Sequence, residues 1–161
     1  RFADFVRSIA EQFCSYEGGV LIETPDKDFD LQIDKLRIRL LITNLMNNAV
    51  RHGEANLVNV KVRFTQKSGV IEVEDNGEGI PAEHLAQICE PFYRADSSRR
   101  RNTGGFGLGL YLCRLIAEAH GGELTIKSEA NKGTEISVRL PRQAPKTVQN
   151  PPNQTALSLR L

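Results

Sequence analysis

Apolar residues recur at helical spacing in three parts of the chain, and each stripe predicts an amphipathic helix. The first stripe lies in residues 2–13. The second helix can be capped by Asp34, runs to about His52, and has as its buried positions Ile38, Leu41, Ile42, Leu45, Met46 and Ala49. The third is defined by Leu108, Leu112, Leu115, Ile116 and Ala119.

Strict alternation of apolar and polar residues predicts strands between these helices. The clearest pair covers residues 58–64 and 70–75, joined by a turn at Lys67, Ser68 and Gly69, and we expect a hairpin. Further strands are predicted at 20–24, 123–128 and 134–140, and Leu31 and Ile33 also alternate like a strand. Pro81 suits the first position of a short helix that extends through Ile88.

This order of elements predicts an α+β fold, a two-layer sandwich with helices on one face of the sheet. We expect one domain over residues 1–141, because glycine is absent after Arg142 and Gln, Asn and Thr dominate there. Residues 142–161 are therefore predicted to be a disordered tail. The polar, arginine-rich stretch 92–104 is predicted to be a mobile loop.

The amino-acid composition argues against several classes of function. The 161 residues carry 21 Lys+Arg against 20 Asp+Glu, which argues against a strongly basic nucleic-acid binder. No apolar run is long enough for a membrane span, and the three widely spaced cysteines suggest neither a disulfide framework nor a zinc site. Because the chain begins without Met inside an amphipathic pattern, we expect it to be a piece of a longer protein.

Six of the thirteen glycines fall in two clusters, at residues 75–79 and 104–109. The second cluster precedes a predicted helix, where free N–H groups and the helix dipole favour an anion such as phosphate. Neither a Walker nor a Rossmann motif has its required context here. Simple turns in a loop-rich domain remain the alternative explanation for each cluster.

Polar residues at two inward positions add to this picture. Asp75 shares a strand face with Ile71 and Val73, so its carboxylate should point to the apolar side and accept from a donor such as a purine amino group. Thr134 faces inward by the same parity. The alternatives are a turn that starts at Asp75 and a hydrogen-bonded core threonine.

On the second helix, Asn44, Asn48, Arg51 and His52 share a wedge of roughly 100°. Amide oxygens are acceptable Mg²⁺ ligands, and Arg51 could contact phosphate oxygens. A solvent-facing last turn is the alternative. Between Phe92 and Gly104 the charges sum to +3, which implies a polyphosphate or an acidic partner.

Together these segments resemble the catalytic, ATP-binding domain of two-component sensor histidine kinases, in the group that includes gyrase and the heat-shock chaperone. Residues 44–52 resemble the Asn box, 75–81 the first glycine box, 90–94 the Phe box and 105–110 the second glycine box. The resemblance implies the Bergerat fold, with three helices over a mixed five-stranded sheet and a flexible ATP lid between Phe92 and Gly104.

The resemblance also implies roles. Asp75 would bind the adenine amino group with Thr134 acting through water, and Asn48 would hold Mg²⁺ with help from Asn44. Asn44 and Arg94 are the candidate catalytic residues. The remaining candidate nucleotide contacts are Arg51, His52, Gly77, Gly79, Ile80, Phe92, Gly105, Phe106, Gly107, Leu108, Gly109 and Leu110. Phe106 and His52 depart from the residues that the family often carries, a small residue and a Tyr.

By the same resemblance the γ-phosphate would go to a histidine of a dimerisation and phosphoacceptor domain upstream of Arg1, and later to a response regulator receiver domain. The parent would be a homodimer anchored in the bacterial inner membrane, and this domain would be cytoplasmic, touching neither membrane nor nucleic acid. An ATP-hydrolysing conformational switch or a serine kinase that regulates a sigma factor is the alternative. Those proteins use a Glu as base where this chain has Asn44, which cannot act as one. A degenerate regulator that binds nucleotide without catalysis is a further alternative, and the intact boxes argue against it.

Overall fold

The computed structural model describes residues 1–52, 57–93 and 107–143. Along the chain these residues form α1 (Phe2–Ala10) with a 3₁₀ turn at Glu11–Phe13, β1 (Val20–Glu23), α2 (Lys35–His52), β2 (Val58–Phe64), β3 (Ser68–Asp75), α3 (Ala82–Leu85), α4 (Gly109–Ala119), β4 (Glu123–Glu129) and β5 (Gly133–Pro141). The order of helices and strands follows the hydrophobic pattern closely.

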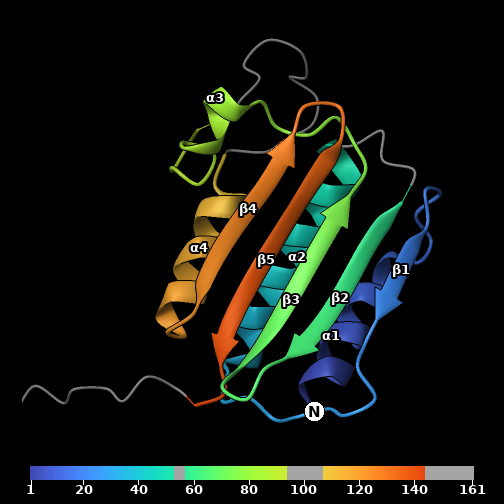
Figure 1. The fold of residues 1–161 in the computed structure, drawn as a ribbon, viewed down its shortest axis with the longest axis vertical. Coiled ribbons are helices and arrows are strands. Elements are labelled where there is room, and N and C mark those ends of the chain that lie inside the picture. Colours follow the sequence, from blue (N-terminus) through green and yellow to red (C-terminus); the bar gives the residue numbers. More distant parts are fainter. Residues whose placement is uncertain (53–56, 94–106, 144–161) are drawn as a thin grey trace, which may run out of the picture.

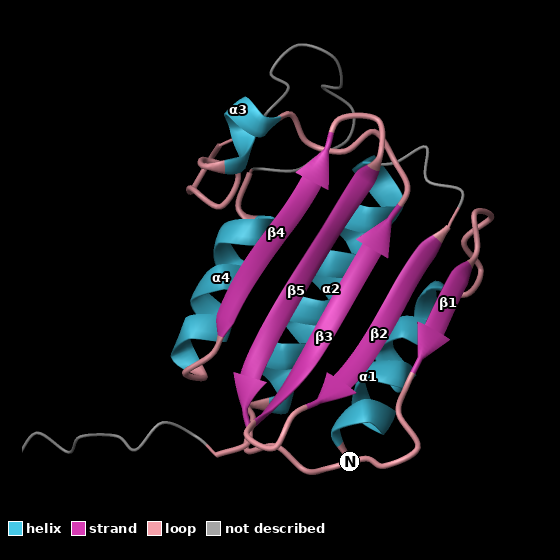
Figure 2. Cartoon of the chain, viewed as in Figure 1, coloured by secondary structure: helices cyan, strands magenta, loops and turns pink. Residues whose placement is uncertain are grey.

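The strands form one five-stranded sheet in the order β1-β2-β3-β5-β4. β1 pairs with β2 in parallel, and the other three pairs are antiparallel, so the sheet is mixed. The long helices α1, α2 and α4 cover one face of the sheet, and the other face is left open (Figure 1 and Figure 2). The predicted α+β two-layer sandwich is confirmed.

The core lies between the helices and the inward side chains of β2, β3 and β5. All six predicted positions of the α2 stripe are at most 3% exposed. The helix begins where Asp34 predicts, because the Asp34 Oδ1 accepts hydrogen bonds from the backbone N–H groups of Leu36 and Arg37. The β4–β5 hairpin and the loop that follows β3 lie at the end of the sandwich where α2 ends (Figure 1).

Three expectations about local structure were wrong. Leu31 and Ile33 lie outside any strand, although both side chains pack against the core, because an irregular segment that crosses the end of a sandwich can also bury alternate residues. The short helix after Pro81 ends at Leu85 rather than Ile88. Ser68 and Gly69 belong to β3 instead of the turn before it.

The predicted stripe of α4 was also partly wrong. Leu108 and Leu115 are 37% and 40% exposed, whereas Cys113 and Ala117 are buried. The buried face of α4, formed by Cys113, Ile116 and Ala117, packs against α2 and β4, whereas Leu108 precedes the helix and Leu115 lies beside that face. The Cys113 Sγ lies 3.6 Å from the carbonyl oxygen of Leu41 on α2, and burial raises the pKa of this thiol to about 12.

The open face of the sheet carries charged side chains in cross-strand pairs. Lys61 contacts Glu74 at 3.3 Å and Arg63 contacts Glu72 at 3.0 Å, while Lys127–Glu135 and Arg139–Glu123 both measure 2.9 Å. Alternation between this charged face and the apolar inward face is what fixes the register of the sheet.

Candidate nucleotide-binding site

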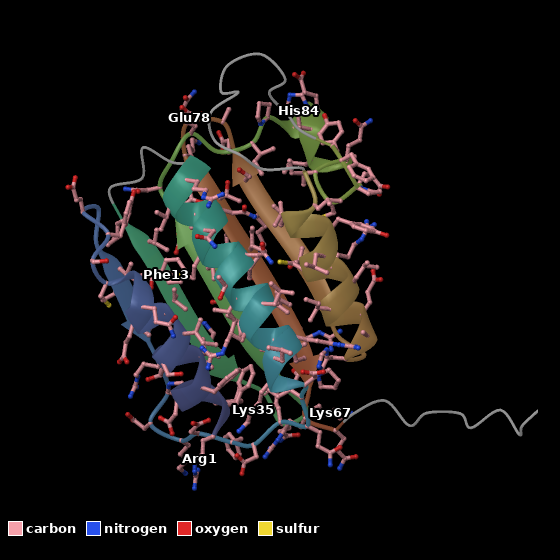
Figure 3. The ribbon with its side chains drawn as sticks, turned by 180° about the vertical axis from the view of Figure 1, so that it is seen from behind. Arg1, Phe13, Lys35, Lys67, Glu78 and His84 are labelled. Carbon is pink, nitrogen blue, oxygen red and sulfur yellow. The ribbon has the colours of Figure 1, made fainter. Side chains whose placement is uncertain are left out.

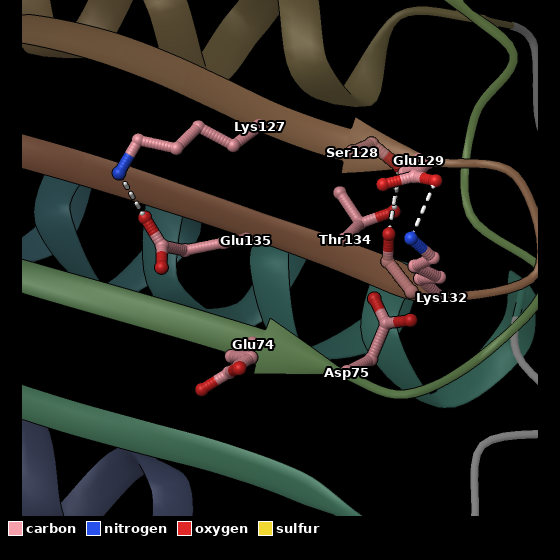
Figure 4. Close-up of a pocket in the computed structure, with 9 residues that line it drawn as sticks. Glu74, Asp75, Lys127, Ser128, Glu129, Lys132, Thr134 and Glu135 are labelled. Carbon is pink, nitrogen blue, oxygen red and sulfur yellow. Dashed lines mark hydrogen bonds and ion pairs between the residues drawn. The ribbon is translucent and has the colours of Figure 1, made fainter.

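Asp75 occupies the last position of β3, directly opposite Thr134 on β5. It keeps the parity of Ile71 and Val73, both of which are buried, so Asp75 lies in line with the inward positions of β3. One carboxylate oxygen accepts a hydrogen bond from the backbone N–H of Gly77 at 2.9 Å. Figure 4 shows Asp75 and Thr134 side by side at the end of the sheet.

Ser128 on β4 is a residue that sequence reasoning missed. Its Oγ accepts from the backbone N–H of Ile80 at 2.7 Å, donates to the carbonyl of Gly133 at 2.8 Å, and lies 2.9 Å from the Thr134 Oγ1. This hydroxyl therefore connects the loop after β3 to β5. Its parity with Leu124 and Ile126, which face the core, was the available signal.

The glycines near Asp75 are required by the protein's own backbone. Gly79 has φ of +67°, and a Cβ there would lie 2.0 Å from the carbonyl oxygen of Glu129. Gly133 has φ of +95°, and its Cβ would lie 1.9 Å from the carbonyl oxygen of Asp75. These contacts hold the loop after β3 against the β4–β5 hairpin. The carbonyl of Glu78 also accepts from the N–H of Asn131 at 2.6 Å.

A depression of about 290 Å³ lies at this end of β3, β4 and β5, and its lining includes Glu74, Lys127 and Glu135 of the open face of the sheet. Its lining includes two predicted site residues, Asp75 and Thr134, together with Ser128. The rim is charged, with the Glu129–Lys132 pair at 2.6 Å and the Lys127–Glu135 pair on either side (Figure 4). This end of the sheet thus offers a carboxylate and two hydroxyls within a small polar region.

The second half of the candidate site lies where α2 meets the beginning of α4. A Cβ added to Gly109 would lie 3.6 Å from the Asn44 Oδ1 and 3.9 Å from both amide atoms of Asn48. Asn44 donates its own Nδ2 to the carbonyl of Leu40 at 3.0 Å, which turns its Oδ1 away from that contact. The structure therefore brings Asn44 and Asn48 of the Asn box close to Gly109 of the second glycine box.

The first turn of α4 suits an anion. Leu108 precedes the helix without a side-chain cap, and the first turn contains no acidic residue. The N–H groups at this end therefore have no side-chain acceptor among the described residues, and the positive end of the helix dipole points the same way. Asn44 and Asn48 lie beside this helix end. Their side-chain amide oxygens, which could bind a metal ion, are therefore close to backbone N–H groups that could bind an anion.

Two described residues connect α4 to the segment before it. The N–H of Phe92 donates to the carbonyl of Gly107 at 3.1 Å, and Gly107 has φ of +70° with the Tyr93 carbonyl oxygen 2.6 Å from where its Cβ would be. Phe92 is 73% exposed and has φ of 65°, an uncommon conformation for a bulky residue. Arg94, Gly105 and Phe106 lie outside the described residues, and so does the side chain of His52.

The other predicted contacts are more dispersed. Arg51 is exposed in the last turn of α2, Ile80 and Gly77 are half-buried in the loop after β3, and Leu110 packs partly against the core. No group of three or more His, Cys, Asp or Glu residues gathers as a metal site in the described part of the chain. The donors present, Asn44 and Asn48, fit a Mg²⁺ ion that takes its other ligands from water and phosphate.

A family model for histidine kinase-, DNA gyrase B- and HSP90-like ATPases matches residues 33–144. The chain therefore belongs to this family of ATPases. Among its relatives, the sensor histidine kinase YkoH of Bacillus subtilis is 37% identical over 130 residues, 80% of this chain and 28% of YkoH. The sensor protein SrrB of Staphylococcus aureus is 36% identical over 110 residues, 68% of this chain and 19% of SrrB.

Solved structures agree on the fold. The mycobacterial sensor histidine kinase MprB has a TM-score of 0.74 at 21% identity, covering 89% of this chain and 97% of that one. The catalytic domain of histidine kinase ThkA has a TM-score of 0.73 at 24% identity, covering 88% and 95%. Full-length ShkA, solved in complex with AMPPNP, matches over 90% of this chain and 31% of its own length, with a TM-score of 0.74 at 24% identity.

These relatives define the class more closely. The chain is an ATP-binding catalytic domain of the sensor histidine kinase type, as the resemblance of its four boxes implied. A conformational-switch ATPase or a sigma-factor serine kinase is not favoured. The chain spans about a quarter of YkoH and a fifth of SrrB. In the described residues, no helix has the length and hydropathy that a membrane crossing requires.

Proposed function

We propose that this domain binds Mg²⁺-ATP between Asp75 and the beginning of α4, and presents the γ-phosphate to a histidine of a phosphoacceptor domain. The observation that supports the proposal is the proximity of Gly109 to Asn44 and Asn48, whose amide atoms lie 3.6 to 3.9 Å from where a Cβ of Gly109 would be. It puts metal-binding oxygens next to a helix end that favours phosphate. The complex of ShkA with AMPPNP adds support from a protein of the same fold.

The proposed contacts with adenine, phosphate and Mg²⁺ are made by residues in different parts of the site. Asp75 would accept the adenine amino group, and Thr134, held by Ser128, would act through water. The N–H groups of Gly107, Leu108 and Gly109 would donate to phosphate oxygens, with Arg51 adding positive charge. Asn48 and Asn44 would hold Mg²⁺, which neutralises phosphate charge when bound. The catalytic roles of Asn44 and Arg94, and the nucleotide contacts of the remaining candidate residues, are proposed on the resemblance.

The domain lacks a base for water one turn before Asn48, since that position is Asn44. We therefore expect slow hydrolysis and transfer of phosphate to another group. Phosphoryl transfer depends mainly on positioning and electrostatic stabilisation, so presenting the γ-phosphate is a sufficient role for a catalytic domain of this kind.

The acceptor histidine is proposed to lie in a dimerising helical domain of the same protein, and a response regulator receiver domain is the proposed next acceptor. A homodimeric parent anchored in the inner membrane, with this domain in the cytoplasm and in contact with neither membrane nor nucleic acid, completes the proposal. The names and greater lengths of YkoH and SrrB support further domains in the parent.

Mixing this domain with the separately produced phosphoacceptor domain and radiolabelled ATP tests the phosphotransfer. We expect acid-labile phosphohistidine that disappears in Asn48→Ala and persists in Asn47→Ala, a matched control on the same helix. Label on serine, or no label despite bound ATP, would overturn the kinase proposal.

Nucleotide titration tests the adenine assignment separately. Asp75→Asn should lower ATP affinity by about tenfold or more, because a charged hydrogen bond to the base is lost. Glu72→Gln, on the open face of the same strand, should leave the affinity within about twofold. An unchanged affinity in Asp75→Asn would contradict the role of this carboxylate.

A further inference from the structure

His84 on α3 makes a contact that none of the roles above uses. Its Nδ1 lies 2.6 Å from the Tyr93 Oη, and the two rings are 6.0 Å apart at 50°. The other ring nitrogen, Nε2, lies 3.6 Å from the Glu83 carboxylate. The His84 side chain is only 24% exposed, so the hydrogen bond to Tyr93 is partly shielded from water. Figure 3 places His84 and Glu78 at the same end of the molecule, opposite Arg1 and Lys35.

Tyr93 in turn limits where α4 can begin. Its carbonyl oxygen would lie 2.6 Å from a Cβ on Gly107, and the neighbouring Phe92 N–H donates to the Gly107 carbonyl. Gly107 is followed by Leu108 and by Gly109, where an added Cβ would lie 3.6 to 3.9 Å from the amide atoms of Asn44 and Asn48. Two hydrogen bonds and the chain from Gly107 to Gly109 therefore link His84 to the end of α4 that lies near the amide side chains of α2.

A second contact fixes the same turn from α4. The Glu90 carboxylate lies 3.3 Å from Arg114, and the Tyr93 N–H donates to the Glu90 carbonyl at 3.2 Å. The Glu90–Arg114 pair is more exposed than the His84–Tyr93 contact, so solvent weakens it more. Of these two side-chain contacts to the turn at Glu90–Tyr93, the His84–Tyr93 hydrogen bond is therefore the better shielded from solvent.

We propose that His84 is a positioning residue for the triphosphate, acting through Tyr93 and Gly107 on the first turn of α4. This inference rests on the proposed ATP binding. His84 touches neither the adenine end at Asp75 nor Ser128 in any described contact, so its influence should be confined to the phosphate end of the nucleotide. Loss of the His84–Tyr93 hydrogen bond would leave the first turn of α4 less well placed beside Asn44 and Asn48.

A comparison of two ligands tests whether His84 affects only the phosphate end of the nucleotide. In titrations of the domain with Mg²⁺-ATP and with adenosine, His84→Ala should lower the affinity for ATP by about three- to tenfold and change that for adenosine by less than about twofold. A general loss of structure would weaken both ligands equally, and that result would overturn the proposal. Wild-type protein that binds no ATP would instead refute the proposed function.

Three further variants separate the hydrogen bond from packing. His84→Asn places an amide atom near the Nδ1 position and should restore most of the ATP affinity. In the double variant His84→Ala with Tyr93→Phe, the loss should be close to that of either single variant, because both remove the same contact. Additive losses, or no rescue by Asn, would overturn the proposal. Gln87→Ala, at an exposed position in the turn after α3, serves as the control and should leave ATP affinity unchanged.

Discussion

Gly109 and Asn44 lie side by side where α4 begins next to α2, with the Asn44 Oδ1 3.6 Å from the position of a Cβ on Gly109. The distance corresponds to ordinary van der Waals contact, so the fold itself does not require glycine here. The absence of a side chain instead leaves the amide groups of Asn44 and Asn48 accessible from the end of α4. We therefore expect Gly109 to matter more for the proposed nucleotide binding than for folding.

Gly109→Ala should consequently separate stability from binding. Because alanine favours helix by up to about 1 kcal/mol over glycine, we expect the free energy of unfolding to stay the same or rise. The added methyl group would occupy the space beside the amide oxygens, and ATP affinity should fall about tenfold. Urea unfolding and nucleotide titration measure the two effects. Unchanged ATP affinity would contradict the proposed phosphate end.

Gly133→Ala should show the opposite behaviour. Its φ of +95° is unfavourable for alanine, and the added Cβ would lie 1.9 Å from the Asp75 carbonyl oxygen. We expect the free energy of unfolding to fall by about 3 kcal/mol or more. Urea unfolding measured beside Gly109→Ala gives a direct comparison of two glycines. A loss below about 1 kcal/mol would show that the β4–β5 hairpin adjusts easily.

Ser128→Ala should weaken the adenine end. The Ile80 N–H would lose its acceptor and Thr134 its partner, which we expect to cost about 1 to 3 kcal/mol of unfolding free energy. ATP and adenosine should both bind more weakly, because both carry the adenine base. Thr125→Ala, at an exposed position of the same strand, is the control. Full retention of adenosine affinity would show that Ser128 has no part in the site.

Asp28 should make the stability of the domain depend on pH in the acid range. Burial tends to raise the pKa of this carboxyl, but hydrogen bonds from the backbone N–H groups of Ala3, Asp4 and Phe29 outweigh it and hold the pKa below the ordinary 3.8. A lowered folded-state pKa means that the stabilisation is complete above pH 3.8 and is lost as the pH falls through the lower value.

Asp28→Asn should therefore lower the melting temperature at pH 7, and the difference from wild type should shrink as the pH falls below 3.8. Thermal unfolding between pH 2 and pH 7 measures this. Asp26→Asn, at an exposed position nearby, should leave the melting curve unchanged. A difference that is constant over the whole range would mean that the charge of Asp28 does not contribute.

Sequence periodicity predicted the parts of the fold that depend on one buried face. The α2 stripe and the β2–β3 hairpin were confirmed because the regular spacing of their apolar residues marks the face that packs on the core. Prediction was weaker at Leu115, an exposed leucine beside the buried face of α4, and at Leu31, where an irregular segment packs on the core. The interaction of His84 with Tyr93 had no signal in the sequence, because no regular spacing joins a short helix to a turn.

The sequence by itself determined the chemistry of this protein: an inward carboxylate at Asp75, amides at Asn44 and Asn48, and glycines before α4. Local spacing sets which face of a helix or strand a side chain occupies, and that information is present in the chain. Only the tertiary structure decided which groups meet. Gly109 reaches Asn44 through the packing of α4 on α2, and Ser128 reaches Ile80 and Thr134 through the register of β4 and β5. These contacts join segments distant in sequence, so they follow from how the layers pack and not from any local pattern.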